Sequence, residues 1–299
     1  MHPRFREMLA LLRSRNVKLT MTSNGLSVAA LDDDELRAFH DLEFSLDYPT
    51  REEQDAQRGR AAGIWCTRKR ERCRRLGVPV TIVAVMMRTN FRRLAEIAGI
   101  AGRYGAPLRV NVCQSVRTVA FAPTYEQYWE AFELLLSQTD VLAVGEPLVR
   151  AMLGLPRGEG GCGAGTVRVT PRATVQPCVY WPGPGDPLRL LLEVGANVVA
   201  TPAFRAARSL PPACEPCELR EACGGDAPAA GSSTGRSIDP IGIAPSCAAN
   251  GDGCQCASRR AAICPRPAAP APRSSWRARR RRNRRDALNS ATIERSVPR

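Results

Sequence analysis

The sequence contains very little histidine, with only His2 and His40 among its 299 residues. Histidine is the usual general base near neutral pH, so the sequence argues against a catalytic dyad or triad built on this residue. The chain also lacks any run of 18 apolar residues, and residues 1–20 lack the apolar stretch of a signal peptide. We therefore expect a soluble, cytoplasmic protein that does not cross a membrane.

Positive charge is abundant but concentrated towards the C-terminal end. The net charge is +14, and residues 226–299 hold 14 arginines, no lysine and 5 acidic side chains. The run RRRRNRR at Arg279–Arg285 would attract any polyanion, but no folded scaffold accompanies it. The four cysteines in this segment, Cys247, Cys254, Cys256 and Cys264, fit no common zinc-finger spacing. We expect no specific nucleic-acid partner.

Short apolar strands alternate with amphipathic helices from Met1 to about Leu155, which predicts an α/β fold with a parallel sheet. The predicted strands are Val17–Thr22, Leu42–Leu46, Val80–Met86 and Leu108–Val112, and the predicted helices include Thr67–Leu76 and Phe91–Tyr104. In such sheets, ligands bind beyond the C-terminal ends of the strands. The residues found there are Ser23-Asn24-Gly25, Asp47-Tyr48-Pro49, Arg88-Thr89-Asn90 and Gln114. They suit a binding face, although ordinary turns have a similar composition.

A second segment, residues 156–225, is richer in glycine, proline and cysteine. It contains two predicted strands around a turn, Thr166–Thr170 and Ala173–Val179. Residues 226–299 show no apolar periodicity and have the Pro/Ala/Ser/Arg bias of a disordered chain. We therefore expect three parts: 1–155, 156–225 and 226–299.

The cysteines of the second segment have the spacing of metal ligands. Cys214-x2-Cys217-x5-Cys223 would point three thiolates into one cup, and Cys162 and Cys178 flank the predicted hairpin. Clustered thiols in a cytosolic chain more often bind metal than form disulfides. Spacing alone leaves zinc and an iron–sulfur cluster both open. The isolated cysteines, Cys66, Cys73 and Cys113, are interpreted as small buried apolar residues.

Three segments of the sequence together carry a family resemblance. They are MTSNGL (21–26), LEFSLDYPTREEQDAQRG (42–59), and CGAGTVRVTPRATVQPCVYW (162–181) with CEPCELREAC (214–223). Over residues 1–225 the chain resembles radical S-adenosylmethionine (SAM) enzymes with a C-terminal SPASM domain. The first two motifs match strand ends of that family's barrel. The third matches its auxiliary cluster domain.

The resemblance implies an incomplete (β/α) barrel that binds SAM, followed by a small cysteine-rich domain holding auxiliary 4Fe-4S clusters. By position, Cys162 and Cys178 would ligate one cluster, and Cys214, Cys217 and Cys223 another. The residues implied near the SAM pocket are Ser23, Asn24, Ser45, Asp47 and Asn111. The family reaction is hydrogen abstraction from a peptide or small molecule by a 5′-deoxyadenosyl radical. The alternative is a non-enzymatic zinc or iron–sulfur binding module with a basic tail.

The sequence departs from the family pattern in three places. No C-x3-C-x2-C loop occurs in residues 1–160, so we expect an N-terminally truncated chain that is inactive alone and has no catalytic residue to assign. Ala173 stands where the family's hairpin has glycine, at a cost of about 1 kcal/mol if the turn needs positive φ.

The third departure is Ala227, where the family has a cysteine. Reading the codons after Gly225 in a shifted frame permits a cysteine at the junction of codons 226 and 227. We therefore interpret residues 226–299 as a frameshift product, with a genuine disordered basic tail as the alternative. A junction other than T-G-C in the coding DNA would contradict the frameshift.

Overall fold

The computed structural model describes residues 2–59, 67–113, 120–157, 163–179, 181, 183–210 and 217–224. Its main sheet has four parallel strands, which lie side by side in the order in which they occur in the chain. They are β1 (Leu19–Ser23), β2 (Phe39–Ser45), β3 (Val80–Met86) and β4 (Leu108–Val112). The predicted parallel α/β architecture is therefore confirmed, and β3 and β4 have the predicted bounds.

Helices connect and cover these strands. They are α1 (Phe5–Ser14), α2 (Leu26–Ala30), α3 (Asp33–Arg37), α4 (Arg51–Arg58), α5 (Thr67–Arg75), the 3-10 turn η1 (Phe91–Arg93), α6 (Leu94–Arg103), α7 (Tyr125–Gln138) and α8 (Pro147–Met152). The predicted helix Phe91–Tyr104 is thus divided into η1 and α6. Side-chain caps fix several helix starts: Thr50 accepts from the Glu53 amide at α4, and Thr124 forms a capping box with Gln127 at α7.

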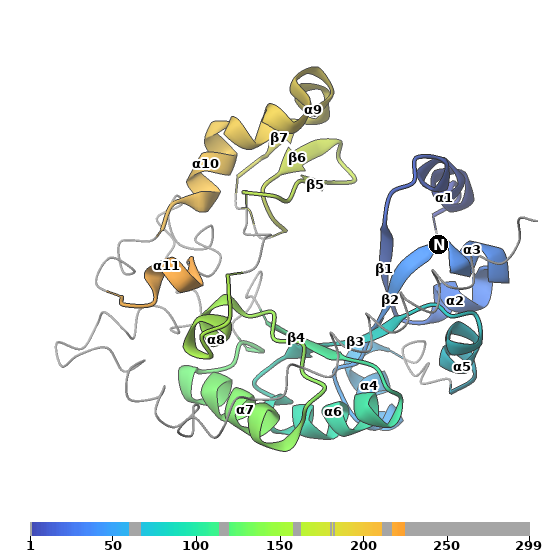
Figure 1. The fold of residues 1–299 in the computed structure, drawn as a ribbon, viewed down its shortest axis with the longest axis vertical. Coiled ribbons are helices and arrows are strands. Elements are labelled where there is room, and N and C mark those ends of the chain that lie inside the picture. The colour runs from blue at the N-terminus through green and yellow to red at the C-terminus, as the bar shows by residue number, and fades with distance from the viewer. Residues whose placement is uncertain are drawn as a thin grey trace, which may run out of the picture.

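The core of the main sheet lies on one face only. Strand residues such as Ile82, Ala84 and Leu108 alternate towards this face and pack against large buried side chains of α7, including Trp129 and Phe132. Figure 1 shows α4, α6 and α7 along this side of the sheet. Each fully buried large apolar side chain contributes about 1.5–3 kcal/mol relative to an exposed one, so this layer fixes the sheet against its helices.

A second, antiparallel sheet follows. It consists of β5 (Arg168–Val169), β6 (Thr174–Gln176) and β7 (Asp186–Pro187), covered by α9 (Leu188–Val194), the 3-10 turn η2 (Gly195–Ala200) and α10 (Pro202–Arg208). Its small core contains Val175, Val198 and Phe204. The predicted hairpin is present, with shorter strands, and β7 was not predicted. Ala173 in the hairpin turn has φ +56°, the left-handed conformation anticipated for this position.

One stretch of this second part is apolar enough to be mistaken for a membrane span. Leu188–Arg208 is 21 residues long with a mean hydropathy of 1.2, which is weak evidence by length and composition alone. In the structure it is divided among α9, η2 and α10, and its Val198 and Phe204 pack with β6. We interpret it as the helical cover of the small sheet.

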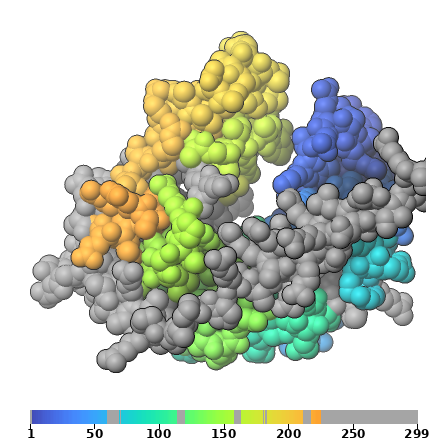
Figure 2. Space-filling view, in the orientation of Figure 1, coloured from blue at the N-terminus to red at the C-terminus, as the bar shows by residue number. Residues whose placement is uncertain are grey.

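Helix α8 precedes the second sheet in the chain, and the last described helix, α11 (Arg220–Cys223), follows it. Leu219 and Cys223 pack against the core of the main sheet, and α11 contacts α8. Figure 1 shows the elements following an arc from α1, through β1–β4 and α8, to α9 and α10. The space-filling view shows the α1 end and the α9 end of this arc standing apart (Figure 2).

Candidate functional site

The face of the main sheet opposite the helices is mostly polar. Strand register places the following residues on it: Thr22, Glu43, Ser45, Thr81, Val83, Val85, Arg109 and Asn111. Because residues in register on parallel strands share a face, these side chains form one continuous surface across β1–β4.

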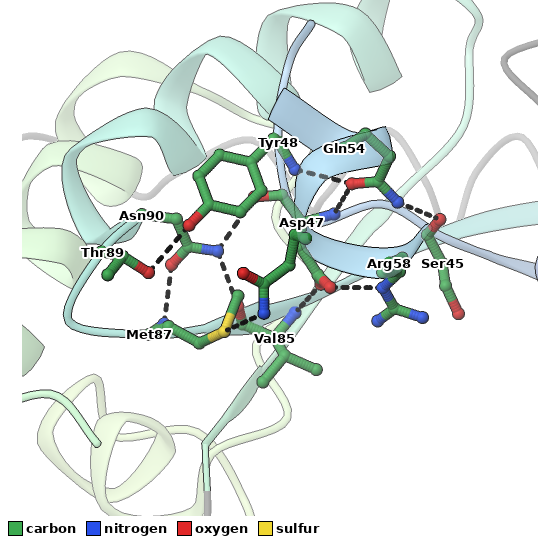
Figure 3. Close-up of polar contacts among 10 residues, drawn as sticks. Ser45, Asp47, Tyr48, Gln54, Arg58, Val85, Met87, Thr89 and Asn90 are labelled. Atoms are coloured by element: carbon green, nitrogen blue, oxygen red, sulfur yellow. Dashed lines mark hydrogen bonds and ion pairs between the residues drawn. The ribbon is translucent and has the colours of Figure 1, made fainter. Parts of the chain in front are cut away.

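Asp47 lies at the C-terminal edge of this polar face, just beyond β2, and is only 3% exposed. Its Oδ1 accepts a hydrogen bond from the Val85 amide at 2.8 Å, and its Oδ2 pairs with Arg58 Nε at 2.5 Å. Figure 3 shows β3 and α4 both reaching this carboxylate. Since both carboxylate oxygens have partners within the chain, Asp47 fixes the ends of β2 and β3 and holds the Arg58 guanidinium beside the polar face.

Asn90 joins the same two strand ends from the other side. Its Nδ2 donates to the carbonyls of Asp47 and Val85, both at 2.9 Å, and its Oδ1 accepts from the Met87 amide at 2.6 Å. The side chain is 1% exposed, so all three partners would be left buried and unpaired without it. Asn90 therefore holds the turn after β3 against the turn after β2 (Figure 3).

Gln54 completes this edge from α4. Its Oε1 accepts from the amides of Asp47 and Tyr48 at 3.0 and 3.1 Å, and its side chain is fully buried. Tyr48 in turn donates its hydroxyl to Thr89 at 2.7 Å, which joins the two turns at their outer rim. The C-terminal edge of β2 and β3 is thus rigid before any ligand arrives.

The predicted SAM-pocket residues separate into two groups. Ser45 and Asn111 lie on the polar face near the Asp47 edge, and within the described residues neither side chain forms a hydrogen bond, so both can bond a ligand. Ser23 is in register with Phe44 on the helix-covered face, where its hydroxyl accepts from the Gly25 amide at 2.8 Å. The exposed Asn24 accepts from the Leu26 amide at 3.1 Å. The structure therefore groups Ser45, Asp47 and Asn111, whereas Ser23 and Asn24 shape the turn after β1.

Deeper on the same face is an ion pair that the sequence analysis missed. Arg109 of β4 reaches across β3 to Glu43, with Nη1–Oε1 at 2.6 Å and Nη2–Oε2 at 2.9 Å. Thr22 donates to the same carboxylate at 2.5 Å. Glu43 is 8% exposed, so the pair compensates a buried charge. The sequence signal that could have revealed this pair is the presence of a charged residue, Glu43 or Arg109, inside each of two otherwise apolar strands.

Cys113 follows β4 and faces the Asp47 edge. Burial raises the pKa of its thiol above the usual range, and the nearby Asp47 carboxylate raises it further. Cys113 is half-buried, whereas Cys73 is completely buried in the core beside α5, so of these two only Cys73 matches the interpretation as a buried apolar residue. Cys66 lies outside the described residues.

Three of the five predicted cluster ligands are described: Cys178, Cys217 and Cys223. Cys162 and Cys214 lie outside the described residues. The Gly163 amide donates to the Pro177 carbonyl at 3.3 Å, so the immediate neighbours of Cys162 and Cys178 are hydrogen-bonded to each other. Among the residues that the structure describes, no three Cys, His, Asp or Glu side chains gather as a metal site.

A shallow depression of about 550 Å³ lies elsewhere, between α6 and the C-terminal end of α7. Small residues of α6, including Ala95, Gly99 and Gly102, form part of its lining. It is on the helical layer, on the opposite side of the sheet from the polar face, so we assign no part of the candidate site to it.

Comparison with known proteins agrees with these features. The chain is 28% identical over 190 residues to the mycofactocin maturase MftC of Mycolicibacterium smegmatis, covering 59% of this chain and 48% of that protein. It is 29% identical over 195 residues to MftC of Mycobacterium tuberculosis, covering 60% and 49%. The chain thus spans about half the length of the curated relatives it matches. No protein-family model matches it.

Solved structures show the same fold at lower identity. The structure of anSMEcpe with bound AdoMet and the Cp18Cys peptide has a TM-score of 0.59 and 12% identity, covering 88% of this chain and 79% of that one. A tagged form of anSMEcpe with bound AdoMet has a TM-score of 0.61 and 14% identity, covering 88% and 75%. Taken with the strand-end and cysteine motifs, these relationships support a radical SAM/SPASM-family protein, and the solved structures share its fold.

Proposed function

We propose that this chain is an iron–sulfur protein whose cysteine-rich part binds an auxiliary cluster and whose polar sheet face belongs to a SAM and substrate pocket. The observation that carries the proposal is the hydrogen bond between Gly163 and Pro177, which brings the chain segments bearing Cys162 and Cys178 together. The donor set fits, because thiolates are the usual ligands of iron–sulfur clusters. A bound cluster would supply one-electron redox chemistry.

The polar face supports the second half of the proposal. Ser45 and Asn111 offer side chains without partners among the described residues, and Asp47 holds Arg58 beside them. These groups can donate hydrogen bonds to the hydroxyls and carboxylate of an amino-acid-derived ligand such as SAM. We propose that the pocket extends from the Asp47 edge towards the Glu43–Arg109 pair.

One structural neighbour, anSMEcpe, was solved with a bound peptide, and the curated relatives are named as maturases. We therefore propose a peptide as the substrate class for the complete catalytic unit. We also propose a cytoplasmic location, where the thiols would remain reduced. The proposed division is a barrel-derived part (1–155), a cluster-binding part (156–225) and residues 226–299.

Iron and sulfide analysis after anaerobic reconstitution tests the proposal. We expect iron and acid-labile sulfide in near-equal amounts, and Cys178→Ala or Cys223→Ala should each lose a substantial share of both. Cys73→Ala is the matched control, because Cys73 is buried in the core beside α5 and should not affect iron content. Zinc without sulfide would favour the alternative of a zinc-binding module. Retention of neither metal would contradict both functions.

A further inference from the structure

Arg208, the last residue of α10, contacts Gly163, the residue that follows Cys162, and a role for it there rests on the proposed cluster function. Gly163 has φ +71°, and a Cβ there would lie 2.7 Å from the Phe204 carbonyl oxygen and 3.1 Å from the Ala207 Cβ. The 2.7 Å approach to a backbone oxygen is closer than a Cβ tolerates, and φ is in the left-handed region, so glycine is required here. The backbone that follows Cys162 is therefore pressed directly against α10.

Arg208 holds this close approach in place. Its Nη1 donates to the Gly163 carbonyl at 2.6 Å and to the Val199 carbonyl of η2 at 2.7 Å. Within the described part of the chain it forms no ion pair with a carboxylate, so its positive charge is not compensated by an acidic side chain there. A hydrogen bond from a charged donor is stronger than one from a neutral donor.

Gly163 transmits this contact to the other cysteine segment. Its amide donates to the Pro177 carbonyl at 3.3 Å, while its own carbonyl accepts from Arg208. Thr166 donates to the same Pro177 carbonyl at 3.5 Å, which further restricts it. Two successive hydrogen bonds therefore link Arg208 to Gly163 and Gly163 to Pro177. Pro177 directly precedes Cys178 and directly follows β6 of the small sheet.

We propose that Arg208 is a positioning residue for the cluster held by Cys162 and Cys178. It fixes the Gly163 peptide, and through it the separation of the two ligand-bearing segments. Interactions one step beyond the ligands typically change metal affinity about 10- to 100-fold, so losing Arg208 should weaken cluster retention measurably.

The test compares three substitutions in the full chain: Arg208→Gln, Arg208→Lys and Arg205→Gln. Arg205 is the matched control, because it lies on the same helix and donates to the carbonyl of Ala200, which belongs to neither cysteine segment. The measurements are the rate of iron loss to a chelator and the electron paramagnetic resonance spectrum of the reduced protein. The spectral component that Cys178→Ala removes identifies the signal of this site.

We expect R208Q to lose iron about 10-fold faster than the unsubstituted chain and to show a changed spectrum of that component. R208K should be intermediate, because it keeps the charge on a shorter side chain that cannot reach both carbonyls in the same way. R205Q should behave as the unsubstituted chain. Unchanged iron loss and spectrum in both Arg208 variants would overturn the role of Arg208. If the unsubstituted chain shows no component that Cys178→Ala removes, the proposed cluster function itself fails.

Discussion

Ala173 carries a backbone conformation that its own side chain disfavours. Its φ of +56° lies in the left-handed region, which costs an L-residue about 1–2 kcal/mol. The surrounding hydrogen bonds impose it: the Ala173 amide donates to Thr170, and its carbonyl accepts from Leu188 at the start of α9. The turn between β5 and β6 thus stores strain a few residues from Cys178.

Replacing Ala173 with glycine should relieve this strain. The gain is partly offset by the greater freedom of glycine in the unfolded chain, so we expect a net increase of about 0.5–1 kcal/mol in the free energy of unfolding. Urea denaturation followed by circular dichroism measures it. Ala206→Gly on the exposed side of α10 is the control and should lower stability by about 0.5–1 kcal/mol, because its backbone is helical. A loss of stability in A173G similar to that of A206G would refute the strain.

At the scale of elements, the sequence predicted what local patterns determine. Strands β3 and β4 were predicted to the residue, because apolar runs are bounded there by Gly-Val-Pro and Gly-Ala-Pro. β7 was missed because Asp186–Pro187 has neither apolar alternation nor β-branched residues. Its strand character comes only from pairing with β6, which the local sequence does not encode.

The candidate site shows the same limit. Ser45 and Asp47 were found because they end a recognisable strand. The Glu43–Arg109 pair joins residues 66 positions apart, so finding it required the register of three strands. Asn90 joins the ends of β2 and β3 by donating to the carbonyls of Asp47 and Val85, which are far from each other in the sequence. A strand end marks where a site lies, whereas the contacts within it follow from tertiary packing.

Helix α7, which supplies the largest side chains of the main core, begins with a capping box that can be tested. Thr124 accepts from the Gln127 amide, and Gln127 accepts from the Thr124 amide at 3.0 Å. Thr124→Ala should lower the free energy of unfolding by about 1 kcal/mol, because the hydroxyl that caps the helix is removed. Thr124→Ser keeps the hydroxyl and should cost only a small fraction of that. Equal losses in both variants, measured by urea denaturation, would show that the methyl group matters instead of the cap.

At the scale of the whole molecule, the arc carries the two halves of the proposed redox unit. The strands β1–β4 lie in its first half, and β5–β7, α9 and α10 lie in its second half (Figure 1). Helix α11 contacts α8, and Leu219 and Cys223 pack on the core of the main sheet. Cys223 thus packs on the sheet that carries the polar face. A cluster bound by Cys223 would therefore be held at a fixed position relative to that face.

This arrangement makes a definite prediction for the isolated chain. SAM cleavage in this family requires an iron with an open coordination position that binds SAM directly, and no C-x3-C-x2-C loop occurs in the 299 residues. The five cysteines of the second segment match the family's auxiliary sites and not the loop that chelates the methionine group of SAM. We therefore expect the reconstituted chain, reduced with dithionite and mixed with SAM, to retain iron and sulfide but to form no 5′-deoxyadenosine.

Liquid chromatography with mass spectrometry measures the nucleoside, and a complete radical SAM enzyme assayed under the same conditions is the positive control. Product above the level of an iron-free sample would contradict the prediction, because it would require an iron site with an open position within this chain. The Cys178→Ala and Cys223→Ala variants would then locate it: loss of product in one of them would identify the auxiliary site that binds SAM. Absence of product together with bound iron would show that this chain holds clusters without starting the radical reaction.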